Sequence, residues 1–184
     1  MTADKRCHIM THSGFSLIEL LVVIAIIVIS SSLVAFGVKD YQEKSKVERQ
    51  VRQIATDIGE IRIRALTMKQ RHNLVLNQTG YVFQSYSSDD QPKCSGTSPG
   101  GTNLPGKSIN TTYQLKKNAT TYYAGSCANV GGDTYEIDQR GMLSGTTATI
   151  FIDYPGTTAA LDCLTLHTIR VNVGKKNGAN CDDK

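Results

Sequence analysis

The chain has 184 residues, a length that allows one modest domain rather than two. Its net charge of +4 is too mild to indicate a nucleic-acid-binding protein by itself, and its composition, 40% hydrophobic and 20% charged, is that of an ordinary folded protein. Much of the hydrophobic share lies between Phe15 and Val38. The remainder is rich in Gly, Thr, Asn and Tyr and has no Trp, which favours a small β-rich domain with many turns.

The N-terminal segment joins a short polar stretch to a long apolar one. The first stretch, MTADKRCHIMTHSG, carries Lys5 and Arg6, and the second, FSLIELLVVIAIIVISSSLVAFGV, contains one charged residue, Glu19. No residue from Leu20 to Val38 is charged, which is enough for a membrane span of about twenty residues. The short basic end and the long polar part that follows predict a cytoplasmic N-terminus and an exported C-terminal part.

Glu19 is the informative residue of this segment. A carboxylate at the centre of a bilayer costs about 2.5–3.5 kcal/mol, so an intramembrane acid is a functional candidate by default. If the chain is cut after Gly14, Phe15 becomes the amino terminus and Glu19 lies one helical turn from the new ammonium group, at the positive end of the helix dipole. In an assembly, Glu19 could instead neutralise the Phe15 amine of a neighbouring subunit and set the axial register between subunits.

The motif GFSLIELLVVIAI resembles the class III signal of type IV prepilins and type II secretion pseudopilins. The resemblance implies that a prepilin peptidase cuts between Gly14 and Phe15 and methylates the Phe15 amine, and that Glu19 acts in subunit docking. Major pilins of the family often carry a helix-bending Pro at the position that Phe36 occupies here. This departure favours a minor pilin or pseudopilin with an unbroken helix.

Two other interpretations of the N-terminal segment compete. An ordinary secretory signal peptide has a shorter apolar core followed by a small-residue cleavage site, which Ser30, Ser32, Ala35 and Gly37 could imitate. The length of the apolar run and the presence of Glu19 within it argue against this class. An uncleaved single-span anchor is the second alternative.

The five cysteines favour disulfides in an exported domain. Cys7 would leave with the leader, so that an even set remains beyond the apolar run, as an oxidising compartment favours. Four cysteines allow three pairings, and we favour the nearer neighbours, Cys94 with Cys127 and Cys163 with Cys181. No CxxC spacing occurs, and His72 and His167 are isolated, so we expect no metal site and no cofactor.

Residues 39–71 predict an amphipathic continuation of the helix, to about Lys69. They contain no Pro and a single Gly, Gly59, and apolar residues recur at spacings of three and four. We expect this narrow stripe to pack on a sheet, with a free coiled-coil segment as the alternative. The stripe consists of Val47, Val51, Ile54, Ile58, Ile61 and Ala65.

The rest of the chain, residues 72–184, predicts a β-rich domain. Two strands, 73–76 and 81–86, flank a turn at 77–80, and the Pro- and Gly-rich range 87–107 is expected to be a surface loop. Further strands are expected at 111–123, 134–138, 147–154 and 164–173, with turns at 140–141 and 154–156. The chain therefore divides into a leader (1–14), a transmembrane and assembly helix (15–38), its amphipathic continuation (39–71) and an antiparallel β-rich domain (72–184), an α+β fold.

The element order and the stretches IDQRGMLSGTTATIFIDYPG and LHTIRVNVGKKNG are similar to the GspH/FimT group of minor pseudopilins, the H-type of type II secretion. The resemblance implies sheets packed on a long helix and no catalytic residues. The sequence likewise contains no G-x-S-x-G, Walker or H-E-x-x-H motif, so we expect no enzyme, and an exported hydrolase is disfavoured.

Two charged stretches allow weaker hypotheses. Asp89-Asp90 and Asp182-Asp183 could hold a cation, but the spacing of a calcium loop is missing and a solvated surface is favoured. Some FimT-like minor pilins bind DNA through a Gly-Arg-x-Arg element, which corresponds to Gly174-Lys175-Lys176-Asn177 here. The arginine pattern is not met, and a solvated turn with two lysines is the alternative. His167, in a predicted strand, is expected to be structural.

The sequence thus predicts a structural subunit, or a tip or priming component, of a type II secretion pseudopilus or a type IV pilus. We expect it to lie in the inner membrane with a periplasmic C-terminal domain. Its expected partners are the prepilin peptidase, other pilin or pseudopilin subunits and the inner-membrane assembly platform. The alternative is a DNA-binding minor pilin that acts in DNA uptake.

Overall fold

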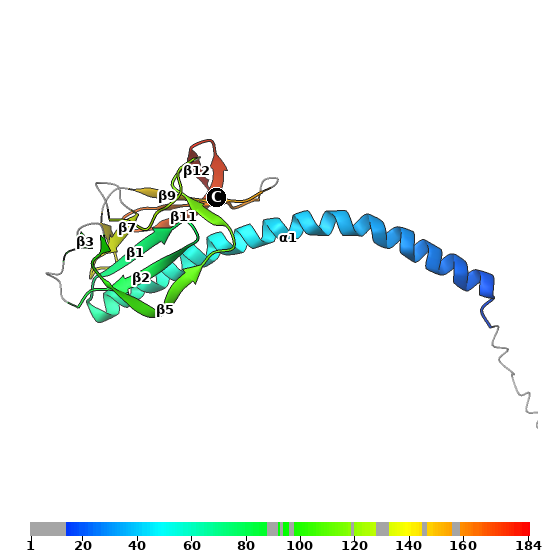
Figure 1. Cartoon of the computed structure of the whole chain (residues 1–184), viewed down its shortest axis with the longest axis horizontal. Coiled ribbons are helices and arrows are strands. Elements are labelled where there is room, and N and C mark those ends of the chain that lie inside the picture. Colours follow the sequence, from blue (N-terminus) through cyan, green and yellow to red (C-terminus); the bar gives the residue numbers. More distant parts are fainter. Residues whose placement is uncertain are drawn as a thin grey trace, which may run out of the picture. The chain divides into compact units, whose positions relative to one another are not determined.

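The computed structural model describes residues 14–87, 92, 94–95, 98–118, 120–127, 133–144, 147–155 and 159–184, without the side chains of residues 32–37 (Figure 1). The chain divides into two compact units, Met1–Lys39 and Asp40–Lys184. We call the second the globular unit. The division places the predicted amphipathic continuation, residues 39–71, almost entirely with the β-rich part of the chain.

One long helix precedes a series of short strands. Helix α1 spans Leu17–Met68 and ends where Lys69 adopts a left-handed backbone conformation, with φ of 54°. The strands are β1 (His72–Asn77), β2 (Gly80–Ser85), β3 (Cys94–Ser95), β4 (Ser98–Pro99), β5 (Thr102–Asn110), β6 (Gln114–Lys116), β7 (Thr134–Ile137), β8 (Leu143–Ser144), β9 (Ala148–Asp153), β10 (Cys163–Leu166), β11 (Val171–Asn177) and β12 (Asn180–Asp183). This arrangement of a helix and antiparallel sheets confirms the predicted α+β class.

The described strands form two larger sheets and one short pair. The first sheet has the order β5-β2-β1-β7-β8 and the second the order β12-β11-β10-β9-β6, and neighbouring strands are antiparallel throughout. Strands β3 and β4 pair with each other. In Figure 1, the cyan part of α1 runs beside the green strands β1 and β2.

The predicted apolar stripe of α1 forms one wall of the core. All six of its residues have no exposed surface, and they share one hydrophobic cluster with residues of both sheets, such as Phe83 of the first and Ile150 of the second. A free coiled-coil segment is therefore the wrong interpretation of this stripe. Its apolar face is already covered by the sheets of its own chain.

The expectation of a loop at residues 87–107 was partly wrong, because strands occur within this range. The edge strand β5 begins at Thr102 and contains Pro105 and Gly106, the residues that favoured a loop. Proline is tolerated at a sheet edge, because its missing N–H is not needed by a second neighbour. The partner strand β2 adapts through a register shift between Val82 and Gln84.

Two further expectations for strands were wrong in detail, and one strand was not expected. The range 164–173 is a hairpin, β10 and β11, closed by a bond from His167 N to Arg170 O (2.9 Å), so His167 lies in a turn. The range 111–123 contains only the short strand β6, because the Asn118 carboxamide accepts from the amides of Thr120 (3.0 Å) and Thr121 (2.8 Å) and turns the chain. Strand β12 was not expected, since its residues are polar.

Two disulfides join Cys94 to Cys127 and Cys163 to Cys181, the favoured pairing. Cys163 on β10 and Cys181 on β12 are separated by β11, and a flat sheet would place such residues about 9.5 Å apart. Their Cα atoms are 5.9 Å apart, so the edge strand folds toward β10. Gly174 of β11 lies where the sheet bends in this way, and a Cβ atom on it would come within 2.2 Å of the Asp182 carbonyl oxygen.

We predict that Ile58→Ala destabilises the globular unit by about 2–5 kcal/mol, because it leaves a cavity in the wall shared by both sheets. Ile63→Ala is the matched control, since Ile63 lies on the same helix with 66% of its surface exposed, and a change within about 0.5 kcal/mol is expected there. Urea unfolding of the full chain in detergent measures both. Equal effects of the two substitutions would contradict the role of the stripe.

Candidate functional site

The predicted cleavage site lies directly before α1, in residues without regular secondary structure. Gly14, Phe15 and Ser16 precede the first helical residue, and the Phe15 side chain is 81% exposed. A Cβ atom built on Gly14 would meet no atom within 4 Å. The Gly14–Phe15 bond is thus uncovered by the described residues. The rest of the predicted leader, Cys7 included, lies outside them, as does Asp89-Asp90.

Glu19 lies in the first turn of α1. The Ser16 carbonyl oxygen accepts from the amides of Glu19 (3.0 Å) and Leu20 (3.2 Å), which makes Ser16 the N-cap residue. Ser16 and Glu19 then occupy the two positions of the S-x-x-E capping box. The carboxylate thus lies in the first turn of α1, where the helix dipole favours a negative charge.

The helix after Glu19 exposes apolar side chains on every face. The consecutive residues Leu20, Leu21, Val22 and Val23 follow one another at about 100° around the helix, and their exposed fractions are 60%, 52%, 48% and 45%. Within the described part of the chain, no helix combines the length and apolar character that crossing a membrane requires. The predicted span from Leu20 to Val38 is therefore not confirmed.

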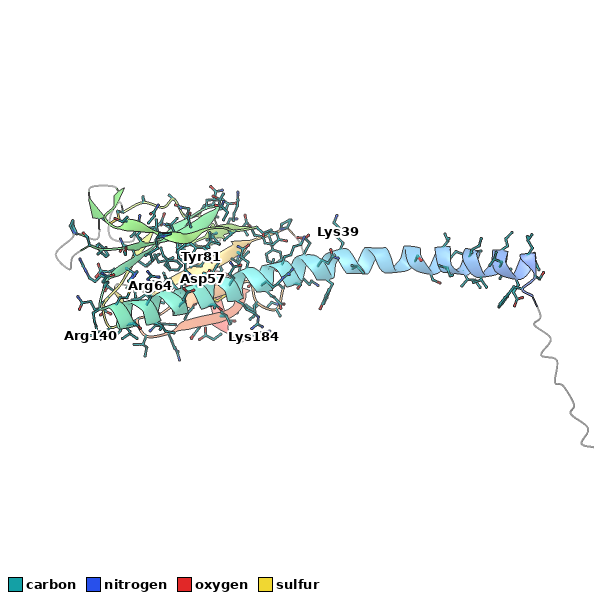
Figure 2. All side chains as sticks on the ribbon, turned by 90° about the horizontal axis from the view of Figure 1, so that it is seen from below. Lys39, Asp57, Arg64, Tyr81, Arg140 and Lys184 are labelled. Carbon is teal, nitrogen blue, oxygen red and sulfur yellow. A yellow bond between two sulfur atoms is a disulfide. The ribbon has the colours of Figure 1, made fainter. Side chains whose placement is uncertain are left out.

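Polar side chains of α1 fasten the helix to the loops and strands around it. The Tyr81 hydroxyl donates to Asp57 Oδ2 at 2.6 Å, and Figure 2 shows the two residues side by side. Gln50 makes two bonds of 2.9 Å with the Tyr113 backbone, and the Tyr113 hydroxyl donates to Glu43. Sequence analysis missed these contacts, because partners 24 to 70 residues apart leave no local pattern.

Arg62 fixes the end of α1 to two turns. Its Nε donates to the Gly141 carbonyl oxygen at 2.6 Å and its Nη2 to that of Ile169 at 2.5 Å. Gly141 has φ of +70°, and a Cβ atom there would lie 2.9 Å from the Arg62 carbonyl oxygen. A glycine is therefore needed for this close approach.

A buried polar cluster follows α1 in the chain. The Arg71 guanidinium lies 4.4 Å from the centre of the Tyr86 ring and 3.5 Å from Glu136 Oε1. His72 is fully buried, with its Nδ1 3.0 Å from the Gln70 carbonyl oxygen. Burial, and secondarily the charge of Arg64, lower the pKa of the His72 imidazole. The cluster contains no nucleophile beside a base, and it fastens β1 to its neighbours.

The two lysines of the DNA-binding hypothesis lie in strand β11 and not in a turn. Lys175 is paired across the hairpin with Asp182, and the Lys176 amide donates to Asp162 Oδ1 at 2.5 Å. Asp182 and Asp183 accept from Asn177 and Asn172 of the same strand. Asp182 therefore lies opposite Lys175, which reduces the attraction of this hairpin for phosphate, whereas Lys176 lies opposite Cys181.

Metal ligands are not gathered anywhere in the described ranges. Among those residues, no group of three or more His, Cys, Asp and Glu side chains could hold an ion. A hollow of about 400 Å³ between α1 and the end of β5 is lined by Lys46, Arg49, Gln50 and Ile109 among others. The described lining of this hollow includes no carboxylate or histidine that could act as a base.

The comparisons with known proteins identify the N-terminal segment. A family model, the prokaryotic N-terminal methylation motif, matches residues 9–35, which include Gly14, Phe15 and Glu19. The chain therefore carries a type IV prepilin-like motif, which implies processing by a prepilin peptidase, assembly with other pilins and a membrane-anchored, pilus-associated protein. No curated protein and no solved structure matches the chain.

We predict that acid destabilises the fold through His72. Because its pKa is lowered in the folded state, the unfolded chain takes up the proton first, so the stabilisation is present above about pH 6.5 and is lost as the pH falls below that value. Urea unfolding in detergent at a series of pH values measures this decline, which should be shallower for His72→Phe. If the free energy of unfolding of His72→Phe falls with pH as steeply as that of the wild type, other titrating groups cause the loss of stability.

Proposed function

We propose that the chain is a minor pilin or pseudopilin, a structural subunit or a tip or priming component of a type II secretion pseudopilus or a type IV pilus. One observation carries this proposal: the methylation motif coincides with an uncovered Gly14–Phe15 bond and a helix that starts at once, with Glu19 in its first turn. The proposed role is not enzymatic.

In this proposal, the prepilin peptidase cuts after Gly14 and methylates the Phe15 amine. The apolar start of α1 then holds the chain in the inner membrane, with the globular unit in the periplasm. When the assembly platform adds the chain to a filament, Glu19 pairs with the Phe15 amine of a neighbouring subunit. The exposed apolar side chains at the start of α1 support this proposal, because lipid or the apolar helices of neighbouring subunits would cover such a surface.

Two finer assignments belong to the same proposal. We place the chain with the GspH/FimT group because two antiparallel sheets pack on the amphipathic part of α1, as the resemblance implies. The alternative, a DNA-binding minor pilin for DNA uptake, receives less support. Of its candidate residues, Lys175 lies opposite Asp182, and the Lys176 ammonium group lies over the Phe151 ring.

The intact mass of the exported protein tests the processing step. We predict a mature chain that begins at Phe15 and carries one methyl group on its amine. The sequence from Phe15 onward and two disulfides fix the expected mass. A chain that begins beyond Ser30 would establish an ordinary signal peptide, and a chain that retains Met1 to Gly14 would establish an uncleaved anchor.

Glu19→Val tests the docking role. We predict that the variant remains in the membrane fraction, since the substitution only adds apolar surface, but that its entry into filaments falls at least tenfold. Immunoblots of membrane and sheared filament fractions measure both quantities. Glu19→Gln, which retains the shape of the side chain, is the control for charge and should fail in the same way. Normal entry of both variants would remove the proposed role of the carboxylate.

A further inference from the structure

The globular unit exposes aliphatic side chains around a hollow at the end of α1. Ile63 is 66% exposed and Leu66 is 45% exposed, and the hollow between them and the β7–β8 turn has a volume of about 260 Å³. We call this feature the Gly59 groove. It is lined by Gly59, Arg62, Ile63, Leu66, Arg140 and Gly141. Ile169, 68% exposed, lies beside the groove, because Arg62 binds its carbonyl oxygen.

Gly59 has no explanation within its own chain. Its helical position does not need a positive φ, and a Cβ atom there would meet no atom within 4 Å. Glycine nevertheless weakens the interior of a helix relative to alanine. Gly59, Ile63 and Leu66 follow one another at spacings of four and three, so they share one face, turned away from the buried stripe. A glycine on an outward apolar face allows the backbone of a partner to approach closely.

The charge around the groove is positive. The described lining of the groove contains two arginines, Arg62 and Arg140, and no carboxylate. Arg140 is exposed at the groove, and Figure 2 shows it next to the C-terminal end of α1. Arg170, the residue after Ile169, is exposed as well. The nearby carboxylate of Glu60 is paired with Lys107 at 2.6 Å, and Asp138 accepts from the backbone amides of Arg140 and Met142.

These observations decide between partners. Two copies of this chain placed groove to groove would bring arginines of the same charge together, which is unfavourable. Nucleic acid would use the arginines but leave Ile63, Leu66 and Ile169 against a polar backbone. A protein helix that carries aliphatic side chains on one face and carboxylates beside them satisfies both the apolar surface and the charge.

We propose that the Gly59 groove is a docking site for an acidic amphipathic helix of a different subunit in the same filament or filament tip. The aliphatic face of that helix packs on Ile63, Leu66 and Ile169, and its backbone approaches α1 at Gly59. Its carboxylates pair with Arg140 and Arg170. This inference rests on the proposed function, because it names the kind of neighbour that an assembled subunit meets.

The experiment measures the entry of the full chain into filaments, in cells that assemble them, and the Tm of each purified variant. Gly59→Leu fills the groove without steric conflict in its own chain, so its Tm should equal or exceed that of the wild type while its entry into filaments falls at least tenfold. Arg140→Glu should lower entry by a similar factor. The matched controls are Gln53→Leu and Arg49→Glu, exposed positions of α1 outside the groove, which should enter normally.

The partner is read out by a photo-cross-linking residue, p-benzoylphenylalanine, at position 63. Mass spectrometry of purified filaments should find it joined to an acidic helical segment of a different subunit. In the partner subunit, the carboxylate nearest to the cross-linked residue is then replaced by Lys. This replacement should restore the entry of the Arg140→Glu variant into filaments. A cross-link to a second copy of this chain or to nucleic acid, or no cross-link at all, would overturn the inference.

Two outcomes separate this inference from the proposed function. If the wild-type chain never enters filaments, both are wrong. If the wild type enters and Glu19→Val does not, while Gly59→Leu and Arg140→Glu enter normally, the proposed function stands and the groove has no docking role.

Discussion

The burial of one narrow helical stripe by two separate sheets is the constraint on which the globular unit depends. Each sheet alone has an apolar face without a cover, and α1 supplies a wall that both share through residues such as Ile58. The polar contacts of Gln50, Asp57 and Arg62 then select one axial position and one rotation of the helix. Those contacts add specificity to a position that apolar packing stabilises.

The rotation of α1 also determines which residues remain outside. Once the stripe faces the sheets, Gly59, Ile63 and Leu66 must face away from them, and Arg62 lies at the margin where it reaches two turns. The same helix therefore serves the core on one side and presents a surface to a neighbour on the other. Its N-terminal part is apolar on all sides, whereas the part in the globular unit has the buried stripe and, near its end, a second short apolar face around Ile63 and Leu66.

Sequence reasoning succeeded where the signal is local and failed where it depends on distant partners. The stripe, the β1–β2 turn and the motif around Gly14 and Glu19 are patterns within a few residues of one another, and each was recognised. Strand β5 was missed because Pro105 excludes a central strand but not an edge strand, and only the sheet order distinguishes the two. The Gly59 groove was missed because its walls come from residues 59–66, 140–141 and 169, which only the folded chain brings together. Gly59 itself, the one glycine of residues 39–71, was the local signal that could have indicated it.

The positions of the two disulfides have a consequence for the order in which the molecule matures. Neither covalent loop, Cys94 to Cys127 or Cys163 to Cys181, encloses α1, β1 or β2, which come first in the chain and contact one another over short separations. The helix and the first hairpin can therefore associate while every thiol is still reduced. Each disulfide joins segments that come later in the chain, Cys94 to Cys127 and β10 to β12, so neither bond is needed for that association.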